Sequence, residues 1–470
     1  MLIKLTYRYI LHFLLFLITA VSLAFVVAKG GLVIGIALLA LPFALAYLVL
    51  QIKYPVVGLY TYLIISFILN GLGRYLDAPM SVMTDGILLL TLLAEFFHRF
   101  YSKKWPSLKN NPVLIFTYVW SAYCVFELVN PQSLGPGPWF FAMRSLFFYM
   151  LIIMILGMEL MNTEKDLDRF LHIWIFFSCL AVIYGAKQLF LGVSAVEQKW
   201  LDDGNALTHV LHGKLRVFSF YSDAGQFGAA MGHIGLVGVI LALGDFSKGK
   251  KLFYWITGLF CLWGLAISGT RGGLFVPIAG FAIYFLLVKN MKLLIVGGGT
   301  ALTILFILKF TFIGQGNYQV QRMRSALDPT DASFQVRLNN QKKLKEYLAS
   351  RPLGGGIGSS GYWGLRFRPD TFLAQTPTDS WYVRVWVETG VVGLTIYLGL
   401  FIYILIYFGI KLWKMEPSMM RQKLMAIYAG VTGVTVANYG NPVIGQTPTS
   451  TVIFLGIAFL YIFTKEEQKT

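Results

Sequence analysis

Apolar runs recur along almost the whole of the 470-residue chain, and they limit its possible folds more than any other feature. Most are close to the roughly 20 residues with which an α-helix crosses a hydrocarbon core about 30 Å thick. Hydrophobic residues make up 57% of the sequence and charged residues only 13%, about half the charged share of a soluble domain. This pattern excludes a soluble globular protein, a disordered tail and a collagen-like fibre. It predicts an all-α, polytopic integral membrane protein with a single membrane domain over residues 1–470.

Runs bounded by Gly, Pro or charged residues predict about fourteen transmembrane helices. They lie at Leu11–Ala28, Leu32–Leu50, Val56–Leu69, Val82–Phe97, Val113–Val129, Leu146–Met161, Leu171–Phe190, Ala224–Leu243, Leu252–Ile267, Leu274–Val288, Leu293–Phe310, Val383–Ile410, Leu424–Tyr439 and Val452–Phe463. The first run follows two basic residues, as in a signal peptide, but its length and the many later spans favour a membrane helix.

Basic residues in the short loops predict the side of the membrane on which each loop lies. With a cytoplasmic N-terminus, every short cytoplasmic loop carries Lys or Arg, and both termini are then cytoplasmic. The exceptions fall on the outer, periplasmic side: the loop 192–223, the turn at Arg271, and the long loop 311–380 between the eleventh and twelfth helices. The long loop holds nine Lys or Arg and five Asp or Glu, a net charge of +4. It is either a solvated face attracted to anionic lipid or part of a site for a phosphate-bearing substrate.

Two arginines on the outer side stand at the edges of apolar helices. Arg216 lies in the segment Lys214–Gly228, which runs from an outer loop into a helix, and Arg271 lies in the tight turn Ser268–Gly273. A guanidinium in such a place can hold a phosphate through two hydrogen bonds. The alternatives are that Arg216 anchors the helix end and that the glycines around Arg271 form only a structural turn. Arg271 has no acidic neighbour in the sequence, so it needs a counter-anion from elsewhere.

The long outer loop contains a polar helix, a glycine-rich stretch and a carboxylate near the membrane surface. Residues 333–350 form the polar helix, which carries Arg337, and Gly354–Gly358 follow it. Glycine-rich backbone can cradle an anion, although such a stretch is often only a mobile loop. Asp379, beside Ser380 and Tyr382, suits sugar recognition and can accept a proton from an attacking hydroxyl. Asp379 can equally be the N-cap of the helix that follows.

In their order along the chain, these motifs resemble those of the bacterial O-antigen ligase and polysaccharide polymerase superfamily. The resemblance covers roughly residues 215–394 and includes Arg216, the Ser-Gly-Thr-Arg turn at Arg271, the Arg…Pro-Leu-Gly-Gly-Gly-Ile-Gly loop and the sequence Glu388–Gly393. Members of the superfamily are metal-independent membrane glycosyltransferases that need no cofactor and use a glycan carried on undecaprenyl diphosphate. The resemblance implies that Arg216 and Arg271 hold the lipid diphosphate and stabilise its leaving charge. It also implies that Arg337 and Arg384 contribute to the same positive field.

The sequence departs from the ligases of this superfamily at the position of their base. Those ligases usually carry a His-Asn pair eleven and ten residues before the Gly of a Glu-x-Gly motif. Counting back from Gly390, these positions hold Asp379 and Ser380. Either Asp379 replaces the histidine as the base, or the acceptor chemistry differs, as in chain polymerisation. None of the six histidines is an obvious replacement, and only His209 and His212 lie on the predicted outer side.

The sequence therefore predicts a glycosyltransferase of the bacterial inner membrane. We expect it to join an undecaprenyl-diphosphate-linked glycan to a sugar hydroxyl of a glycan or lipid-linked acceptor on the periplasmic face, alongside other polysaccharide assembly proteins. We favour a polymerase over a ligase, because the histidine of the ligases is absent. The alternatives are a flippase for lipid-linked oligosaccharides, another transporter, or a non-catalytic scaffold. Nucleic acid is not an expected partner, because the formal charge of +17 is spread between apolar spans rather than gathered in a basic run.

Overall fold

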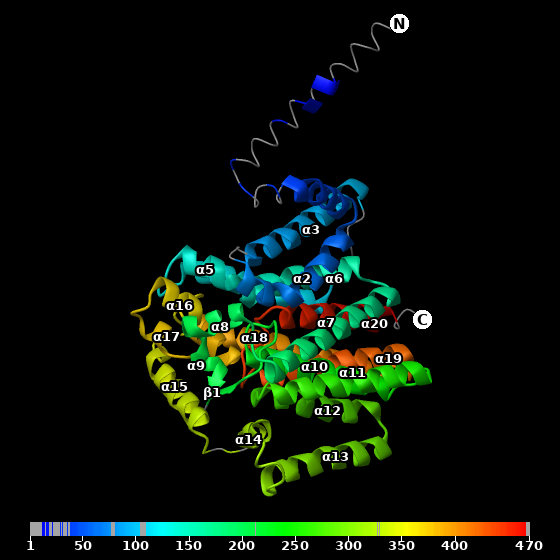
Figure 1. Cartoon of the computed structure of the whole chain (residues 1–470), viewed down its shortest axis with the longest axis vertical. Coiled ribbons are helices and arrows are strands. Elements are labelled where there is room, and N and C mark those ends of the chain that lie inside the picture. The colour runs from blue at the N-terminus through cyan, green and yellow to red at the C-terminus, as the bar shows by residue number, and fades with distance from the viewer. Residues whose placement is uncertain are drawn as a thin grey trace.

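The chain folds almost entirely into helices, which pack side by side in a bundle (Figure 1). The computed structural model describes residues 38–466, apart from 77–79, 104–109, 212, 327 and 329, and a few positions between 12 and 35. Sheet structure within this part is limited to one antiparallel pair, β1 (Val210–Leu211) and β2 (Lys214–Leu215). The prediction of an all-α membrane protein is confirmed.

Long helices make up the bundle. They are α2 (Pro55–Tyr75), α3 (Met80–Ser102), α4 (Pro112–Phe126), α6 (Tyr149–Leu160), α7 (Glu164–Phe190), α10 (Ala224–Ala242), α11 (Lys248–Ile267), α12 (Phe275–Val288), α13 (Met291–Phe310), α18 (Trp381–Lys414), α19 (Met419–Ala437) and α20 (Thr449–Glu466). The remaining α-helices lie between them: α5 (Pro136–Met143), α8 (Ala195–Trp200), α9 (Ala206–His209), α14 (Tyr318–Ser325), α15 (Ala332–Leu348), α16 (Gly361–Phe367) and α17 (Phe372–Gln375).

Within the described part of the chain, nine helices are long and apolar enough to cross a membrane. Three shorter apolar helices accompany them, at Leu38–Lys53, Gly272–Val288 and Thr449–Lys465. Every predicted span from Val56 onward overlaps a described helix. The first predicted span, Leu11–Ala28, lies largely outside the described residues, and the total of fourteen stays a prediction.

One predicted boundary is wrong for a clear electrostatic reason. The span expected to begin at Leu146 continues back through Arg144 and α5 to Pro136. Nη1 of Arg144 lies 2.8 Å from a carboxylate oxygen of Asp85 in α3, and the Tyr149 hydroxyl donates to the same carboxylate at 2.6 Å. Because this ion pair offsets much of the cost of the charge, Arg144 lies inside the helical segment instead of ending it.

Helix α10 lies at the centre of the bundle, and all of its residues are buried. It packs against α7, α11, α12 and α19. Glycines allow the close approach to α11: a methyl group on Gly238 would lie 2.8 Å from the Cα atom of Gly258. Small residues at such a crossing let two helix backbones come together, which strengthens packing where no hydrophobic effect drives association.

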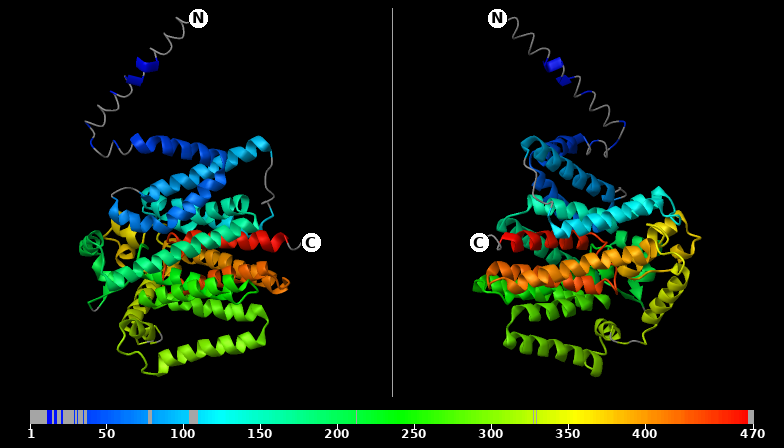
Figure 2. Two further views of the ribbon diagram at one scale, coloured as in Figure 1. Left: turned by 45° about the vertical axis from the view of Figure 1, so that its right-hand side comes forward. Right: turned by 180° about the vertical axis from the view of Figure 1, so that it is seen from behind.

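The short helices and the β pair gather at one end of the bundle, and the C-terminus lies at the opposite end (Figure 1). Helices α14–α17 belong to the long loop 311–380, which runs from α13 to α18. Helix α13 stands apart at the edge of the bundle (Figure 2), and none of its residues is buried.

The α10–α11 crossing predicts a local sensitivity to volume. In Gly258→Ala, the new methyl group would lie 2.8 Å from the backbone nitrogen of Val239, and the helices would have to separate. We expect a loss of stability of about 1–3 kcal/mol, measured as a lower thermal unfolding midpoint of the purified protein. Gly249→Ala is the matched control, because a methyl group there meets nothing within 4 Å. Equal midpoints for the two variants would contradict the tight crossing.

Candidate active site

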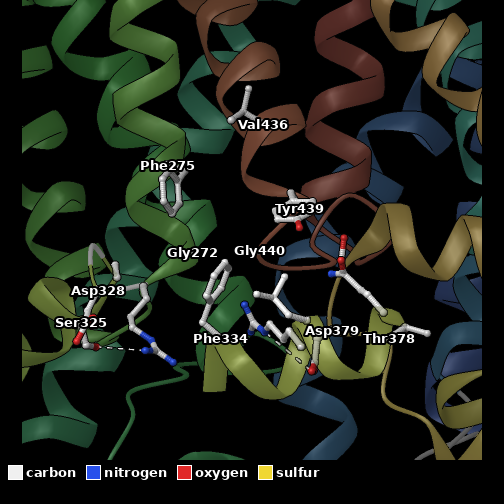
Figure 3. Close-up of a pocket in the computed structure, with 16 residues that line it drawn as sticks. Gly272, Phe275, Ser325, Asp328, Phe334, Thr378, Asp379, Val436, Tyr439 and Gly440 are labelled. Atoms are coloured by element: carbon white, nitrogen blue, oxygen red, sulfur yellow. Dashed lines mark hydrogen bonds and ion pairs between the residues drawn. The ribbon is translucent and has the colours of Figure 1, made fainter. Parts of the chain in front are cut away.

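A cavity of about 570 Å³ opens at the end of the bundle where the short helices gather. The turn at Arg271, helices α14 and α15, the start of α18 and the end of α19 surround it. Its lining residues are Arg271, Gly272, Phe275, Ser325, Ala326, Asp328, Phe334, Arg337, Leu338, Gln341, Thr378, Asp379, Ser380, Val436, Tyr439 and Gly440. In the view of Figure 3, Ser325 and Asp328 lie at one side, Thr378 and Asp379 at the other, and Phe334 between them.

Arg271 forms one polar edge of this cavity, and the counter-anion that the sequence requires is Asp331. Nη1 of Arg271 lies 2.6 Å from Oδ2 of Asp331 and donates to Oγ of Ser325 at 3.3 Å. Asp331 is also the N-cap of α15, where it accepts a hydrogen bond from the backbone nitrogen of Phe334. Partial burial opposes ionisation of Asp331, but these hydrogen bonds and the charge of Arg271 outweigh it and lower the pKa of Asp331.

Arg216 lies beside this edge, outside the residues that line the cavity. Its Nη2 donates to Oγ1 of Thr270, the neighbour of Arg271, at 3.4 Å, and its Nη1 donates to the backbone oxygen of Thr208 at 3.0 Å. Burial lowers the pKa of Arg216, and the nearby charge of Arg322 lowers it further. The structure thus brings the two predicted arginines to one turn of the chain.

Asp379 forms the opposite polar edge. Its carboxylate is partly exposed and lies 3.9 Å from Nε of Arg337 on α15. Of the residues that the sequence offers as an N-cap here, Ser380 occupies the N-cap position of α18, without a side-chain cap hydrogen bond, and Asp379 precedes it. The Ser380 side chain donates to the backbone oxygen of Asn438 at 3.3 Å. Asp379 has a φ of +47°, a left-handed conformation that Asp and Asn adopt more readily than most other residues.

Two other predicted residues point away from the cavity. Arg384 lies 3.2 Å from the Glu388 carboxylate and over the ring of Trp381. The Tyr382 hydroxyl donates to the backbone oxygen of Thr435. Both belong to the first turns of α18, where successive side chains point in different directions, so nearness in sequence to Asp379 does not bring them to the cavity.

The glycine-rich stretch is buried, and it is neither an open anion cradle nor an exposed loop. Helix α18 breaks its regular geometry at Gly390, which has a φ of +67°. Into this break fits the backbone of Pro352–Gly355, with the Gly355 nitrogen donating to the oxygen of Val387 at 2.8 Å. A methyl group on Gly390 would lie only 1.9 Å from the Pro352 oxygen. The two glycine motifs therefore dock against each other and fix the long loop to the bundle.

Sequence reasoning missed three charged residues around the site: Asp331, Arg322 and Arg74. Arg74, at the end of α2, packs its guanidinium 4.5 Å from the ring centres of both Trp200 and Phe218. It also donates to the backbone oxygen of Ser219 at 2.8 Å, which holds the loop after Arg216 in place. A basic residue at the end of an apolar helix was the available signal, but nothing in the sequence ties it to a loop so far along the chain.

Of the two histidines in the loop 192–223, the structure describes only His209. His209 is buried between Trp200 and Phe218, and its Nδ1 lies 2.9 Å from the backbone oxygen of Asn205. Burial lowers the pKa of His209, and the residue packs inside the loop. His212 lies outside the described residues.

Fold and site together define a class: a multi-pass helical membrane protein with a cavity at one end of its bundle, where Arg271 and Asp379 form two charged edges. Residues 256–398 match the family model for O-antigen ligase. This match covers most of the segment 215–394 and supports the resemblance of that segment to the O-antigen ligase and polymerase superfamily. The matched residues include Arg271, Arg337 and Asp379, whereas Arg216 precedes them. A search of curated proteins found no match.

The docked glycine motifs predict that the site depends on Gly390. In Gly390→Ala, the side chain would meet the Pro352 backbone, and the φ of +67° would add strain of roughly 1–3 kcal/mol. We expect faster proteolysis within residues 311–380 and a lower unfolding midpoint. Gly399→Ala in the same helix is the control, because a methyl group there meets nothing within 4 Å. A cleavage rate equal to that of the wild type would show that the loop is not fixed at this point.

Proposed function

We propose that this protein is a membrane glycosyltransferase that transfers a glycan from undecaprenyl diphosphate to an acceptor sugar hydroxyl on the periplasmic face. The observation that carries the proposal is a single cavity with cations at one edge, Arg271 with Arg216 beside it, and a carboxylate, Asp379, at the other. The family match supports a ligase- or polymerase-type role in polysaccharide biosynthesis. The donor, the acceptor and the orientation are parts of the proposal.

The two edges suit the two halves of a glycosyl transfer. The acceptor oxygen attacks C1 of the donor sugar, a new C1–O bond forms, and the bond from C1 to the phosphate oxygen breaks. Asp379 accepts the proton of the acceptor hydroxyl, and the diphosphate leaves with the electron pair of the broken bond. Fixed guanidinium groups at Arg271 and Arg216 stabilise the negative charge that develops on the leaving group.

Arg271 begins this reaction already paired with Asp331 at 2.6 Å. A diphosphate that reaches Arg271 must therefore compete with the Asp331 carboxylate. The competition costs binding energy, but it spares the protein an uncompensated, partly buried charge before the donor arrives. Between the edges, the rings of Phe334 and Tyr439 line the cavity and offer apolar faces to a sugar ring.

We favour chain polymerisation over transfer to a lipid core, because Asp379 and Ser380 stand where the ligases usually carry His-Asn. The flippase alternative has less support, because Arg271 and Asp379 lie in the segments between helices at one end of the bundle. A transport pathway calls for polar groups near the middle of the membrane.

The role of Asp379 predicts a large effect of a small change. Asp379→Asn keeps the size of the side chain and tolerates the left-handed backbone, but it removes the proton acceptor. We expect the rate of polymer formation to fall about 10²- to 10⁴-fold, measured with purified protein and a lipid-diphosphate-linked repeat unit. Asp370→Asn, in an exposed part of the same loop, should leave the rate unchanged. A rate within twofold of the wild type for Asp379→Asn would reject Asp379 as the base.

The glycan profile of cells separates the two forms of transfer. In cells without this protein, complemented with the Arg271→Ala variant, we expect single repeat units to accumulate on the lipid carrier, because the leaving diphosphate is no longer stabilised. Lys343→Ala, which removes an exposed charge from α15, should restore the normal profile. Long polymer retained on the carrier would instead indicate a ligase. A normal profile with Arg271→Ala at full membrane level would refute the proposed mechanism.

A further inference from the structure

Arg322, on α14, brings a third guanidinium within electrostatic range of Arg216 and Arg271. Its side chain packs over this turn, since a methyl group on Gly269 would lie 3.8 Å from Cγ of Arg322. Ser325, one helical turn further along α14, accepts the hydrogen bond from Arg271. Helix α14 therefore lies directly against the edge of the cavity where Arg216 and Arg271 meet.

The Arg322 guanidinium has no partner that explains its place. Its side chain is half-buried, and within the described residues it makes no hydrogen bond and no ion pair within 4 Å. Arg324, two positions further along the same helix, behaves differently. Its guanidinium donates to the backbone oxygens of Thr311 and Ile313 and so ties α14 to the end of α13. One arginine of α14 thus has a structural role, and the other lies beside the turn at Arg271, outside the residues that line the cavity.

Like charges gather at this edge. Three guanidinium groups, those of Arg216, Arg271 and Arg322, act electrostatically on one another, and the Asp223 and Asp331 carboxylates offset part of this repulsion. Among the three, only Arg271 forms an ion pair within the described residues, with Asp331. Burial lowers the pKa of Arg322, and the neighbouring Arg271 lowers it further. Holding like charges together in a partly dry site costs free energy, and a bound anion would lower that cost.

We propose that Arg322 is a third phosphate-binding group, which with Arg216 and Arg271 forms a site that selects a diphosphate over a monophosphate. The inference rests on the proposed function, because it concerns the leaving group of that reaction. Asp331 holds Arg271 until the diphosphate arrives, and the second phosphate is bound by Arg322. The selection has a physical basis, because each charge-assisted contact between guanidinium and phosphate adds to the affinity.

The test uses the full-length protein in nanodiscs of phosphatidylcholine, with farnesyl diphosphate and farnesyl monophosphate as probes and calorimetry as the readout. We expect Arg322→Met to weaken binding of the diphosphate about ten- to a hundredfold, the effect of one lost charge-assisted contact, and to change binding of the monophosphate by less than threefold. Asp331→Asn should strengthen binding of the diphosphate, because it removes the competing carboxylate. Lys343→Met, which removes an exposed charge on the adjacent α15, is the matched control and should bind both probes as the wild type does.

Distinct results overturn the inference and the function on which it rests. Diphosphate affinity unchanged in Arg322→Met, but lost in Arg271→Ala, would reject Arg322 and leave the proposed function standing. Unchanged affinity in Arg216→Ala and Arg271→Ala as well would reject the proposed function itself. Equal losses in Arg322→Met and Lys343→Met would reject a specific contact in favour of general charge attraction.

A conservative variant covers the case in which Arg322→Met does not fold. Arg322→Lys keeps the charge but loses the planar fork of donors. We expect it to bind the diphosphate more weakly than the wild type and Lys343→Met do, but more tightly than Arg271→Ala does. Its unfolding midpoint should equal that of the wild type. Wild-type affinity and wild-type selectivity in Arg322→Lys would show that the planar fork of Arg322 is not needed, and would overturn the proposed contact between its guanidinium and a phosphate.

Discussion

The contact between the Pro352–Gly355 backbone and the break in α18 at Gly390 is the constraint on which the site depends. It joins the long loop to a helix of the bundle through backbone hydrogen bonds, and neither side of the contact has room for a side chain. Once the chain is fixed there, α15 on one side and Asp379 on the other are both held near the same cavity. The Tyr123 hydroxyl, from α4, donates to the Thr389 oxygen at 2.8 Å, so a second helix supports the break.

The two edges of the cavity differ in charge. Three separate segments supply the positive edge: Arg271 lies in a turn, and beside it are Arg216 from the loop 192–223 and Arg322 from α14. The carboxylate edge is weaker, since Asp379 and Arg337 lie 3.9 Å apart and both are partly exposed. Under the proposed function, the diphosphate of the donor would lie toward Arg271 and its sugar toward Asp379.

The sequence predicts local features of this molecule well and long-range pairing poorly. Apolar runs predict the helices because the bilayer requires every backbone group to be paired within a span. The boundary at Leu146 is wrong because Asp85, far away in the sequence, neutralises Arg144. The same limit applies to the site. The need of Arg271 for a counter-anion is visible from its neighbours, but the identity of that anion, Asp331, depends on how the loop folds back.

Tyr382 and Arg384 illustrate a second limit. The sequence predicts Tyr382 as a sugar contact and Arg384 as part of the positive field, yet the helix capped by Ser380 turns them toward Thr435 and Glu388. A correct start for α18 would have been enough to exclude them, since a helix turns about 100° per residue. Small errors in helix ends thus become large errors in which side chains share a site.

Helix α13 gives the long loop unequal supports. At its C-terminal end the loop is joined to α18 through the Gly390 contact. At its N-terminal end it follows α13, which has no buried residue and whose neighbours are mainly α12 and α14. The loop is therefore firmly attached at its C-terminal end and weakly attached at its N-terminal end. A segment held in this way moves most near its weak attachment, which is where α14 lies. The α14 side of the cationic edge is therefore the part of the cavity wall with the least support, whereas Asp379 lies close to the Gly390 contact.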